Sequence, residues 1–528
     1  MLFYESDIQM NTIGYSKSHS YMVDLLMQQK TQLENKSIQL SSGLKSQTYG
    51  GISSDSRMAL ELRREISNIG IYEDSNAIAS IQLDLMGKSL EHMEKMRAES
   101  VSAIDENNYT LTTEGQTTSQ QATEIMLHET ISQLNSEVNG YYLFGGKDAT
   151  EPPVASLDAI MDGQGGKLGL KELMKRYENA HIGASENGRI ESSVTSPAGV
   201  PTLTLQQDNV EGFGFQINSV TASSADVTTA VVPEDVSDPL NLQGKQGTFA
   251  FNDTPVVGDT IEVELELPDG STSVVKLTAT DDPDAGEGTF LIGTGANPTL
   301  ESAQNAQAAF DKAISGIAKT ELRAVADVQA GEEFFGNHGR PDPTPKVPKA
   351  DGSGYETGTD LLVDWYTGTE NDDDPRADKV VQIDDNVRVE YGARANEKAF
   401  SEQLQNLAVF VAADFTAETP DDEASEAEAK AYYAVLAKKS DDALSVAGDR
   451  NSGLQSVASE MSVVNTTVVR TVERQKQELL TYQNTLTGLE NVDKTEVGTE
   501  IAVLSTDLEA SYQATSMLLN LSITNFLR

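Results

Sequence analysis

The C-terminal stretch LQSVASEMSVVNTTVVRTVERQKQELLTYQNTLTGLENVDKTEVGTEIAVLSTDLEASYQATSMLLNLSITNFL (residues 454–527) decides the fold. Its apolar and near-apolar residues recur at steps of three or four, which predicts two long helices with one apolar stripe each. The first stripe misses one position near Gln475, and a break follows at residues 491–493. Beyond Met517 apolar residues surround the helix, so we expect this end to be buried on most sides. The stripes comprise Leu454, Val457, Met461, Val464, Val468, Val472, Leu479, Tyr482, Leu486 and Leu489, then Val497, Ile501, Leu504, Leu508, Tyr512, Thr515, Leu519, Ser522 and Phe526.

A matching stripe lies near the other end of the chain. Its steps alternate between three and four without a slip, which is the coiled-coil period of 3.5. Asn76 and Arg97 are polar positions in this seam and could fix its register. The seam comprises Ile69, Tyr72, Asn76, Ala79, Leu83, Met86, Leu90, Met93, Arg97, Ser100 and Ile104.

Stripes of this kind usually form the core of an ordinary helical bundle. Here they lie at both extremes of the chain with none of that length between, which favours pairing of the two ends. We therefore predict long terminal helices paired as an antiparallel coiled coil or bundle. The predicted assembly interface comprises Leu83, Met86, Leu90, Met93, Leu504, Leu508, Tyr512, Leu519, Leu521, Phe526 and Leu527.

Composition excludes several classes of function. The 528 residues include 83 acidic and 38 basic side chains, a formal charge of −45, which argues against binding nucleic acid or an anionic membrane surface. There is no cysteine, so disulfides, thiolate metal sites and cysteine nucleophiles are absent. No stretch approaches the about 18 apolar residues of a membrane span. The first residues, MLFYESDIQMNTIG, do not form a Sec-type signal peptide.

The first 150 residues otherwise predict disorder followed by helices. Residues 1–15 lack periodicity and are expected to be disordered. A helix follows, with Met22, Leu26, Gln29, Leu33, Leu40 and Leu44 on one face, ending near Gly43. The next helix begins at about Met58, and a further one runs from about Ser119. The face of that last helix comprises Leu127, Ile131, Leu134, Val138 and Tyr141.

The middle of the chain is predicted to be β-rich. Ile261, Val263 and Leu265 alternate with glutamates, which predicts a sheet with one wet face, and residues 260–279 form a hairpin. Other strands are predicted at residues 202–205, 213–220, 248–251 and 290–292. A helix capped by Thr299 covers this domain, and another starts with Thr419 as its cap.

The predicted fold class is α+β and multidomain, with long terminal helices, an inserted β-rich domain and a mixed α/β segment. We divide the chain into an N-terminal helical core (1–150), a helix and linker (151–201), a β-rich domain with one helix (202–335), a linker and mixed outer segment (336–450) and a C-terminal helical core (451–528).

Catalytic motifs are absent from the sequence. The five histidines have no partner at metal-ligand spacing, and a packing role for His128 is far more common than a ligand role. The acidic run at residues 281–287 lacks the ligand pattern of a calcium loop. No phosphate-binding loop and no nucleophile elbow appear. We therefore expect no enzyme, no cofactor and no metal site.

Four segments resemble the flagellin superfamily. Residues 39–66, QLSSGLKSQTYGGISSDSRMALELRREI, are similar to its N-terminal signature. Residues 139–154, NGYYLFGGKDATEPPV, resemble the end of the N-terminal core in the hook-associated protein 3 family of hook–filament junction proteins. Residues 507–528, DLEASYQATSMLLNLSITNFLR, are similar to that family's C-terminal end, and residues 383–400 resemble its alphaproteobacterial members. The Gln-Ala-Asn-Gln-like stretch common in filament flagellins is absent.

The resemblance implies a structural protein of the bacterial flagellum that joins hook to filament. Its implied partners are hook-associated protein 1, flagellin, further copies in a ring, an export chaperone and the type III export apparatus. It implies an extracellular location reached without a cleaved signal peptide. The alternatives are a filament flagellin, a secreted adhesin or binding module that uses the β-rich domain, and a cytoplasmic coiled-coil protein.

Overall fold

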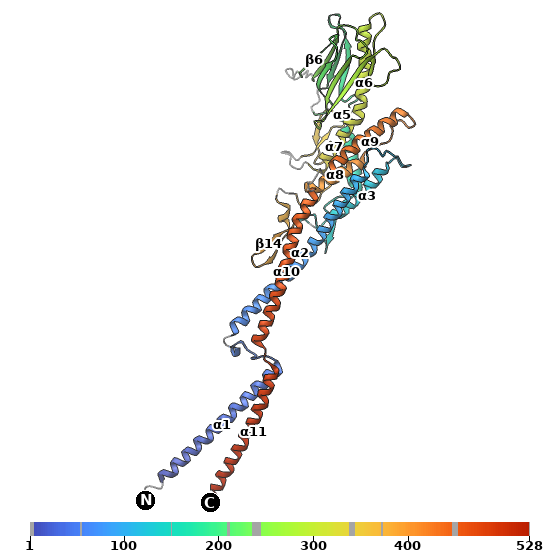
Figure 1. Cartoon of the computed structure of the whole chain (residues 1–528). Helices are drawn as coiled ribbons and strands as arrows, with labels where there is room; N and C mark the ends of the chain where they lie inside the picture. The colour runs from blue at the N-terminus through green and yellow to red at the C-terminus, as the bar shows by residue number, and fades with distance from the viewer. Residues whose placement is uncertain are drawn as a thin grey trace. The chain divides into compact units, whose positions relative to one another are not determined.

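The computed structural model describes residues 5–52, 55–148, 150–208, 212–234, 244–336, 344–370, 373–445 and 452–526, with helical side chains described from residue 20 to residue 517. The fold is α+β, with long helices and several small sheets (Figure 1). The chain divides into two compact units. Unit 1 comprises Met1–Ala79, Val381–Arg388 and Thr466–Arg528, and unit 2 comprises Ser80–Val380 and Val389–Asn465.

Unit 1 is built almost entirely from helices. α1 (Glu5–Ser42) and α11 (Lys494–Phe526) lie side by side and run in opposite directions, since the start of α1 and the end of α11 are at the same end of the pair (Figure 1). The unit also holds the first part of α2 (Ser56–Ala103) and the last part of α10 (Gly453–Glu490). The turn of a hairpin, β13 (Val380–Asp384) and β14 (Val387–Glu390), completes it.

The helical part of unit 2 contains the seam predicted on α2 from Leu83 onward, whereas the first four seam positions lie in unit 1. Leu83, Met86, Leu90 and Met93 are at most 2% exposed. Gln403 from α8 donates a hydrogen bond to the Met93 carbonyl (3.1 Å), so α8 lies against the seam. The other helices and short strands here are α3 (Thr118–Leu134), β1 (Glu137–Val138), β2 (Tyr141–Tyr142), α4 (Leu157–Asp162), α5 (Leu170–Ile182), α7 (Arg323–Phe335), β11 (Lys346–Pro348), β12 (Tyr355–Thr357), α8 (Lys398–Ala412) and α9 (Glu423–Leu444).

The β-rich part of unit 2 consists of two four-stranded sheets and α6 (Pro298–Ile317) around one hydrophobic core. The sheet orders are β10-β9-β8-β5 and β3-β4-β7-β6, antiparallel except for the parallel pair β9–β10. Apolar residues of both sheets face α6 through Phe310 and Ile314. The strands are β3 (Ile190–Thr195), β4 (Thr202–Gln207), β5 (Gln216–Ala222), β6 (Val227–Val232), β7 (Gln246–Phe251), β8 (Thr260–Glu266), β9 (Thr272–Thr280) and β10 (Thr289–Leu291).

Alternation along β8 is confirmed. Ile261, Val263 and Leu265 are buried, whereas the glutamates between them are partly or fully exposed. β8 pairs with β9 in the predicted hairpin. Two strands of this part, β3 and β6, were not predicted. Ile190 and Val227 are their only fully buried residues; the rest of β3 is mostly polar, and the valines that end β6 are exposed, so neither strand has a clear alternation.

The helix predicted to run from Ser119 to Tyr141 is wrong in its last part. α3 ends at Leu134, and Val138 and Tyr141 lie in the hairpin β1–β2. Asn139 and Gly140 at its turn both have positive φ, 54° and 80°. Asn-Gly is a strong sequence signal for this turn, but Val138 and Tyr141 also fit the helical spacing of α3.

Four smaller expectations are also wrong. α1 begins at Glu5, so the expected disorder does not hold for residues 5–15, and residues 1–4 lie outside the described part. The predicted linker contains β11. Asn297, not Thr299, caps α6, and Asp422, not Thr419, caps α9. Both true caps are Asx side chains that accept a backbone N–H of the first turn, which is the stronger capping chemistry.

The Asn-Gly turn yields a matched pair of variants. Gly140 and Gly87, inside α2, both have space for a Cβ atom, but only Gly140 has a positive φ. We expect Gly140→Ala to destabilise unit 2 by about 1–2 kcal/mol. Gly87→Ala should stabilise it by about 0.5–1 kcal/mol. Urea unfolding followed by the fluorescence of the single tryptophan, Trp365, measures both, and midpoint shifts in the same direction would contradict the turn assignment.

Candidate assembly interface

The α1 and α11 helices present matching stripes in unit 1. In each helix the partly covered positions follow steps of four and three, the period of 3.5. The α1 stripe contains the predicted positions from Met22 to Leu40 and adds Lys36, whereas the predicted Leu44 lies beyond the end of α1. In α11 the stripe passes through Ser511, whereas the predicted Tyr512 is 53% exposed. The stripes comprise Met22, Leu26, Gln29, Leu33, Lys36 and Leu40, and Val497, Ile501, Leu504, Leu508, Ser511 and Thr515.

Contacts between α1 and α11 are a mixture of polar and apolar. Lys36 forms an ion pair with Glu500. A groove of about 340 Å³ remains between the helices where large α1 side chains face small α11 side chains. Its lining includes Met22, Leu25, Leu26, Ala510, Ser511 and Ala514.

The breaks that end α1 and α10 lie against each other. Lys45 donates from its backbone to the Glu490 carbonyl (2.7 Å), and Val492 donates to the Gly43 carbonyl (3.0 Å). Arg63 on α2 makes a bidentate contact with the Glu490 carboxylate (3.0 and 2.7 Å). The two helix pairs of unit 1 are therefore joined by backbone hydrogen bonds at a shared break.

A buried layer of amides lies between α2 and α10. Asn76 and Gln475, the polar seam position and the missed stripe position, are 0% and 3% exposed. The Asn76 Nδ2 donates to Gln475 Oε1 (3.0 Å) and to the Ile383 carbonyl (3.1 Å). Gln475 Nε2 donates to the same carbonyl (2.8 Å). One backbone carbonyl of β13 thus accepts a hydrogen bond from an amide of each helix, whereas Asn76 Oδ1 has no hydrogen-bond partner among the described residues.

Charged contacts hold the β13–β14 turn against both helices. Asp384 forms an ion pair with Arg474 on α10, and Tyr72 on α2 donates to Asp385 (2.9 Å). Partial burial is the largest single influence on Asp384 and acts to raise its pKa. The hydrogen bonds from Arg474 and the Asp385 N–H, together with the Arg474 charge, outweigh burial, so the pKa of Asp384 is lowered. We call residues 383–385 the clip, since they contact α2 and α10 at once. Sequence reasoning missed the clip because its partners are remote along the chain.

The predicted interface residues fall into three groups. Leu83, Met86, Leu90 and Met93 are covered by the chain itself, so they are core residues of unit 2 and not a free surface. In α11, Leu504 and Leu508 are half-buried and Tyr512 is exposed. The remaining four lie where side chains are not described or, for the last, outside the described residues: Leu519, Leu521, Phe526 and Leu527.

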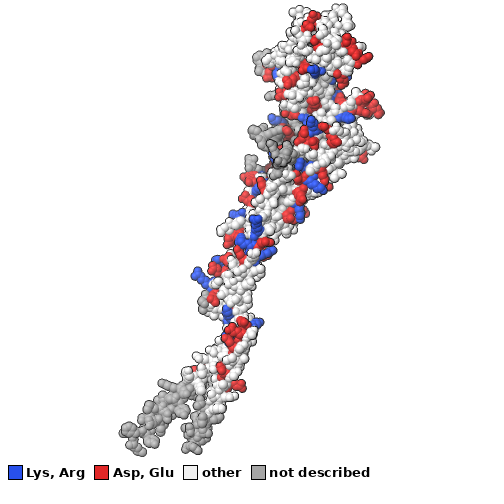
Figure 2. All heavy atoms as spheres, in the orientation of Figure 1, with Lys and Arg blue, Asp and Glu red and all other residues white. Residues whose placement is uncertain are grey.

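Large apolar side chains remain uncovered along the helices of unit 1. They belong to α1, α2, α10 and α11. Figure 2 shows that charged groups are interspersed with uncharged surface. Each of the following is between 45% and 72% exposed: Tyr21, Met27, Ile38, Met58, Leu60, Ile71, Ile78, Leu480, Val503, Tyr512 and Met517. These exposed side chains are candidate anchors for contact with another molecule.

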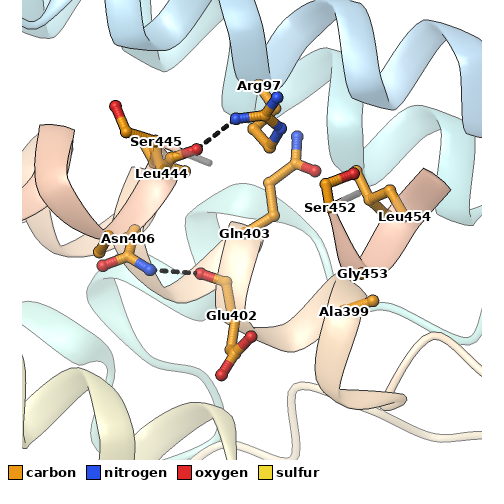
Figure 3. Close-up of a pocket in the computed structure, with 11 residues that line it drawn as sticks. Arg97, Ala399, Glu402, Gln403, Asn406, Leu444, Ser445, Ser452, Gly453 and Leu454 are labelled. Carbon is orange, nitrogen blue, oxygen red and sulfur yellow. Dashed lines mark hydrogen bonds between the residues drawn. The ribbon is translucent and has the colours of Figure 1, made fainter. Parts of the chain in front are cut away.

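Arg97, the second polar seam position, has a capping role in unit 2. Its guanidinium donates to the Leu444 carbonyl at the end of α9 and binds Glu94 through Nε and Nη2 (3.0 and 2.8 Å). Glu94 in turn accepts from Ser452 (2.8 Å) and Gln455 at the start of α10. Figure 3 shows Arg97 beside the small cavity of about 100 Å³ that these helix ends enclose. The polar groups named here form hydrogen bonds at the end of α9 or the start of α10, which gives them a structural role.

Potential metal ligands do not cluster in the part of the chain that the structure describes, where no group of three occurs. His181 is buried, accepts from the Gly214 N–H (3.2 Å) and pairs with Gln329 (3.0 Å), and burial lowers its pKa to about 4. It is therefore a neutral packing residue. Among the described helices, none has the length and apolar character to span a membrane.

Comparison with protein-family models gave no match, and comparison with curated proteins gave none.

A double-mutant cycle tests the amide layer. Asn76→Leu leaves the buried Gln475 oxygen without its donor, so we expect a loss of about 1–3 kcal/mol. The double variant with Gln475→Leu should lose less than the sum of the single losses, by about 0.5–3 kcal/mol. Unfolding in urea followed by helical circular dichroism measures each term. Gln477→Leu, at an exposed α10 position, is the control and should change stability by less than about 0.5 kcal/mol. Additive losses would contradict the layer.

Proposed function

We propose that this chain is a structural subunit that assembles through unit 1. The observation that carries the proposal is incomplete coverage of α1 and α11. Of their two stripes only Val497 is fully buried, whereas the seam of unit 2 is at most 2% exposed at Leu83, Met86, Leu90 and Met93. A pair of helices covers one side of each, so further helices are needed to bury the rest.

Charge favours the same assignment. Unit 1 carries 19 acidic and 13 basic residues, and unit 2 carries 64 and 25. Near balance lets unit 1 of one copy approach unit 1 of another without strong repulsion. The large negative charge of unit 2 favours solubility and mutual avoidance, as suits a part that faces solvent.

Within this class, we propose a junction protein between hook and filament of the bacterial flagellum. The support is the resemblance of residues 39–66, 139–154 and 507–528, at both ends of the chain, to the hook-associated protein 3 family. On this proposal α1 and α11, with α2 and α10, pair as an antiparallel coiled coil. The partners are then hook-associated protein 1, flagellin and further copies in a ring, and the chain is exported by the type III apparatus without a cleaved signal peptide.

The filament flagellin remains the alternative within the superfamily, and a secreted adhesin that uses the β-rich part is the alternative outside it. Immunogold labelling of flagella from the producing cell separates the three. A junction protein gives label only where hook meets filament, and a flagellin gives label along the filament. Label away from flagella would contradict both flagellar assignments.

Substitution of exposed side chains tests whether unit 1 is the assembly surface. Val503, Tyr512 and Met517 are 55%, 53% and 65% exposed, so replacing them with Gln should leave the single chain folded. We expect the triple variant to lose incorporation into flagella by about tenfold or more, since each lost anchor weakens association by about 1 kcal/mol or more.

Val256→Gln with Val257→Gln is the matched control. These side chains are 60% and 59% exposed but belong to the β-rich part of unit 2. Incorporation should be unchanged, as measured by immunoblot of sheared flagella. Loss in the control and not in the triple variant would overturn the assignment of unit 1.

A further inference from the structure

Unit 2 contains a buried carboxyl group that assembly does not use. Asp327 on α7 is 0% exposed. Tyr432 on α9 donates its hydroxyl to Asp327 Oδ2, and Tyr432 is itself fully buried. Within the described residues Asp327 Oδ1 has no hydrogen-bond partner. A buried carboxylate with an unpaired oxygen is unstable, whereas a protonated carboxyl carries no charge.

One cation and two carboxyl groups meet at this position. Arg323 donates from Nε to Glu178 on α5 (2.7 Å), and its guanidinium lies over the Tyr432 ring, 4.2 Å from the centroid. The Arg323 charge is therefore used by Glu178 and by the ring. If Asp327 were ionised as well, the cluster would carry one uncompensated negative charge.

Backbone geometry supports the arrangement. Residues Ala318–Leu322 form a π-helical turn immediately before Arg323, and this turn packs against α9. Such turns shift the face of the following helix and are common at functional sites. Here the shift accompanies the placement of Arg323 and Asp327 on the side of α7 that meets α5 and α9.

We propose that the Asp327 carboxyl is a proton-dependent latch that holds α9 against α5 and α7, closed when protonated and weakened when ionised. It is independent of the proposed flagellar role, since it concerns the folded single chain. The groups that act most strongly on Asp327 are Glu178 from α5, Arg323 from α7 and Tyr432 from α9. α9 is also tied at its end, where Arg97 caps Leu444.

The raised pKa of Asp327 determines how stability changes with pH. Burial, first, and the Glu178 charge raise the pKa of Asp327 well above its ordinary value, although Arg323 and Tyr432 act to lower it. A carboxyl whose pKa is higher in the folded state stabilises that state below the unfolded pKa of about 4. This contribution falls as pH rises and is fully lost once the pH passes the folded pKa.

Hydrogen exchange of the full chain between about pH 5 and about pH 9 tests the latch. Protection factors of α9, corrected for intrinsic exchange, should fall by up to about tenfold per pH unit until the folded pKa is passed. Asp327→Asn keeps the shape and the acceptor for Tyr432, and should remove this fall. Tyr432→Phe removes a donor that lowers the pKa of Asp327, so the fall should continue to higher pH.

Asp442→Asn is the control, since it makes the same change of charge at an exposed position of α9. It should keep the wild-type pH dependence. A wild-type chain whose α9 protection does not change with pH would overturn the proposal. So would an Asp327→Asn variant with the wild-type slope, and circular dichroism at neutral pH establishes that each variant is folded.

Discussion

The amide layer of Asn76, Gln475 and the Ile383 carbonyl is the constraint on which unit 1 depends. Apolar stripes alone permit several registers, since a shift by one heptad again places apolar residues opposite each other. An amide buried without its partner costs about 1–3 kcal/mol, so the layer penalises every register but one. The clip contributes the Ile383 carbonyl, which accepts hydrogen bonds from both amides. A segment remote in sequence therefore helps to fix the register of α2 against α10.

With register fixed, the remaining features of unit 1 follow. The break between α10 and α11 meets the end of α1, and α11 is directed back along α1. Two helices then share stripes of the coiled-coil period without enough surface to bury them. Apolar positions such as Met27 and Val503 therefore stay exposed in the single chain, and the proposed assembly would cover them.

Much of this could be predicted from sequence, because periodicity records which side of an element is covered. The α1 and α2 stripes and the alternation in β8 are examples. The sequence showed Asn76 as a polar position in the seam and Gln475 as a gap in the stripe. It did not show that the two side chains are in contact, since that depends on the register between α2 and α10. The spacing of Val138 and Tyr141 fits both a continued α3 helix and a β-hairpin. The structure has the hairpin, with the Asn-Gly turn between its strands. Asp327 gives no signal at all, because its burial arises from three helices and a π-helical turn.

The central claim is that α1 and α11 need neighbours whereas the seam of unit 2 does not. Hydrogen exchange of the purified monomer, and of the same chain within flagella, measures this most directly. The account predicts that in the monomer α1 and α11 exchange far faster than residues 83–93, and that assembly slows them to a similar rate. Protection of α1 and α11 equal to that of residues 83–93 in the monomer would contradict it.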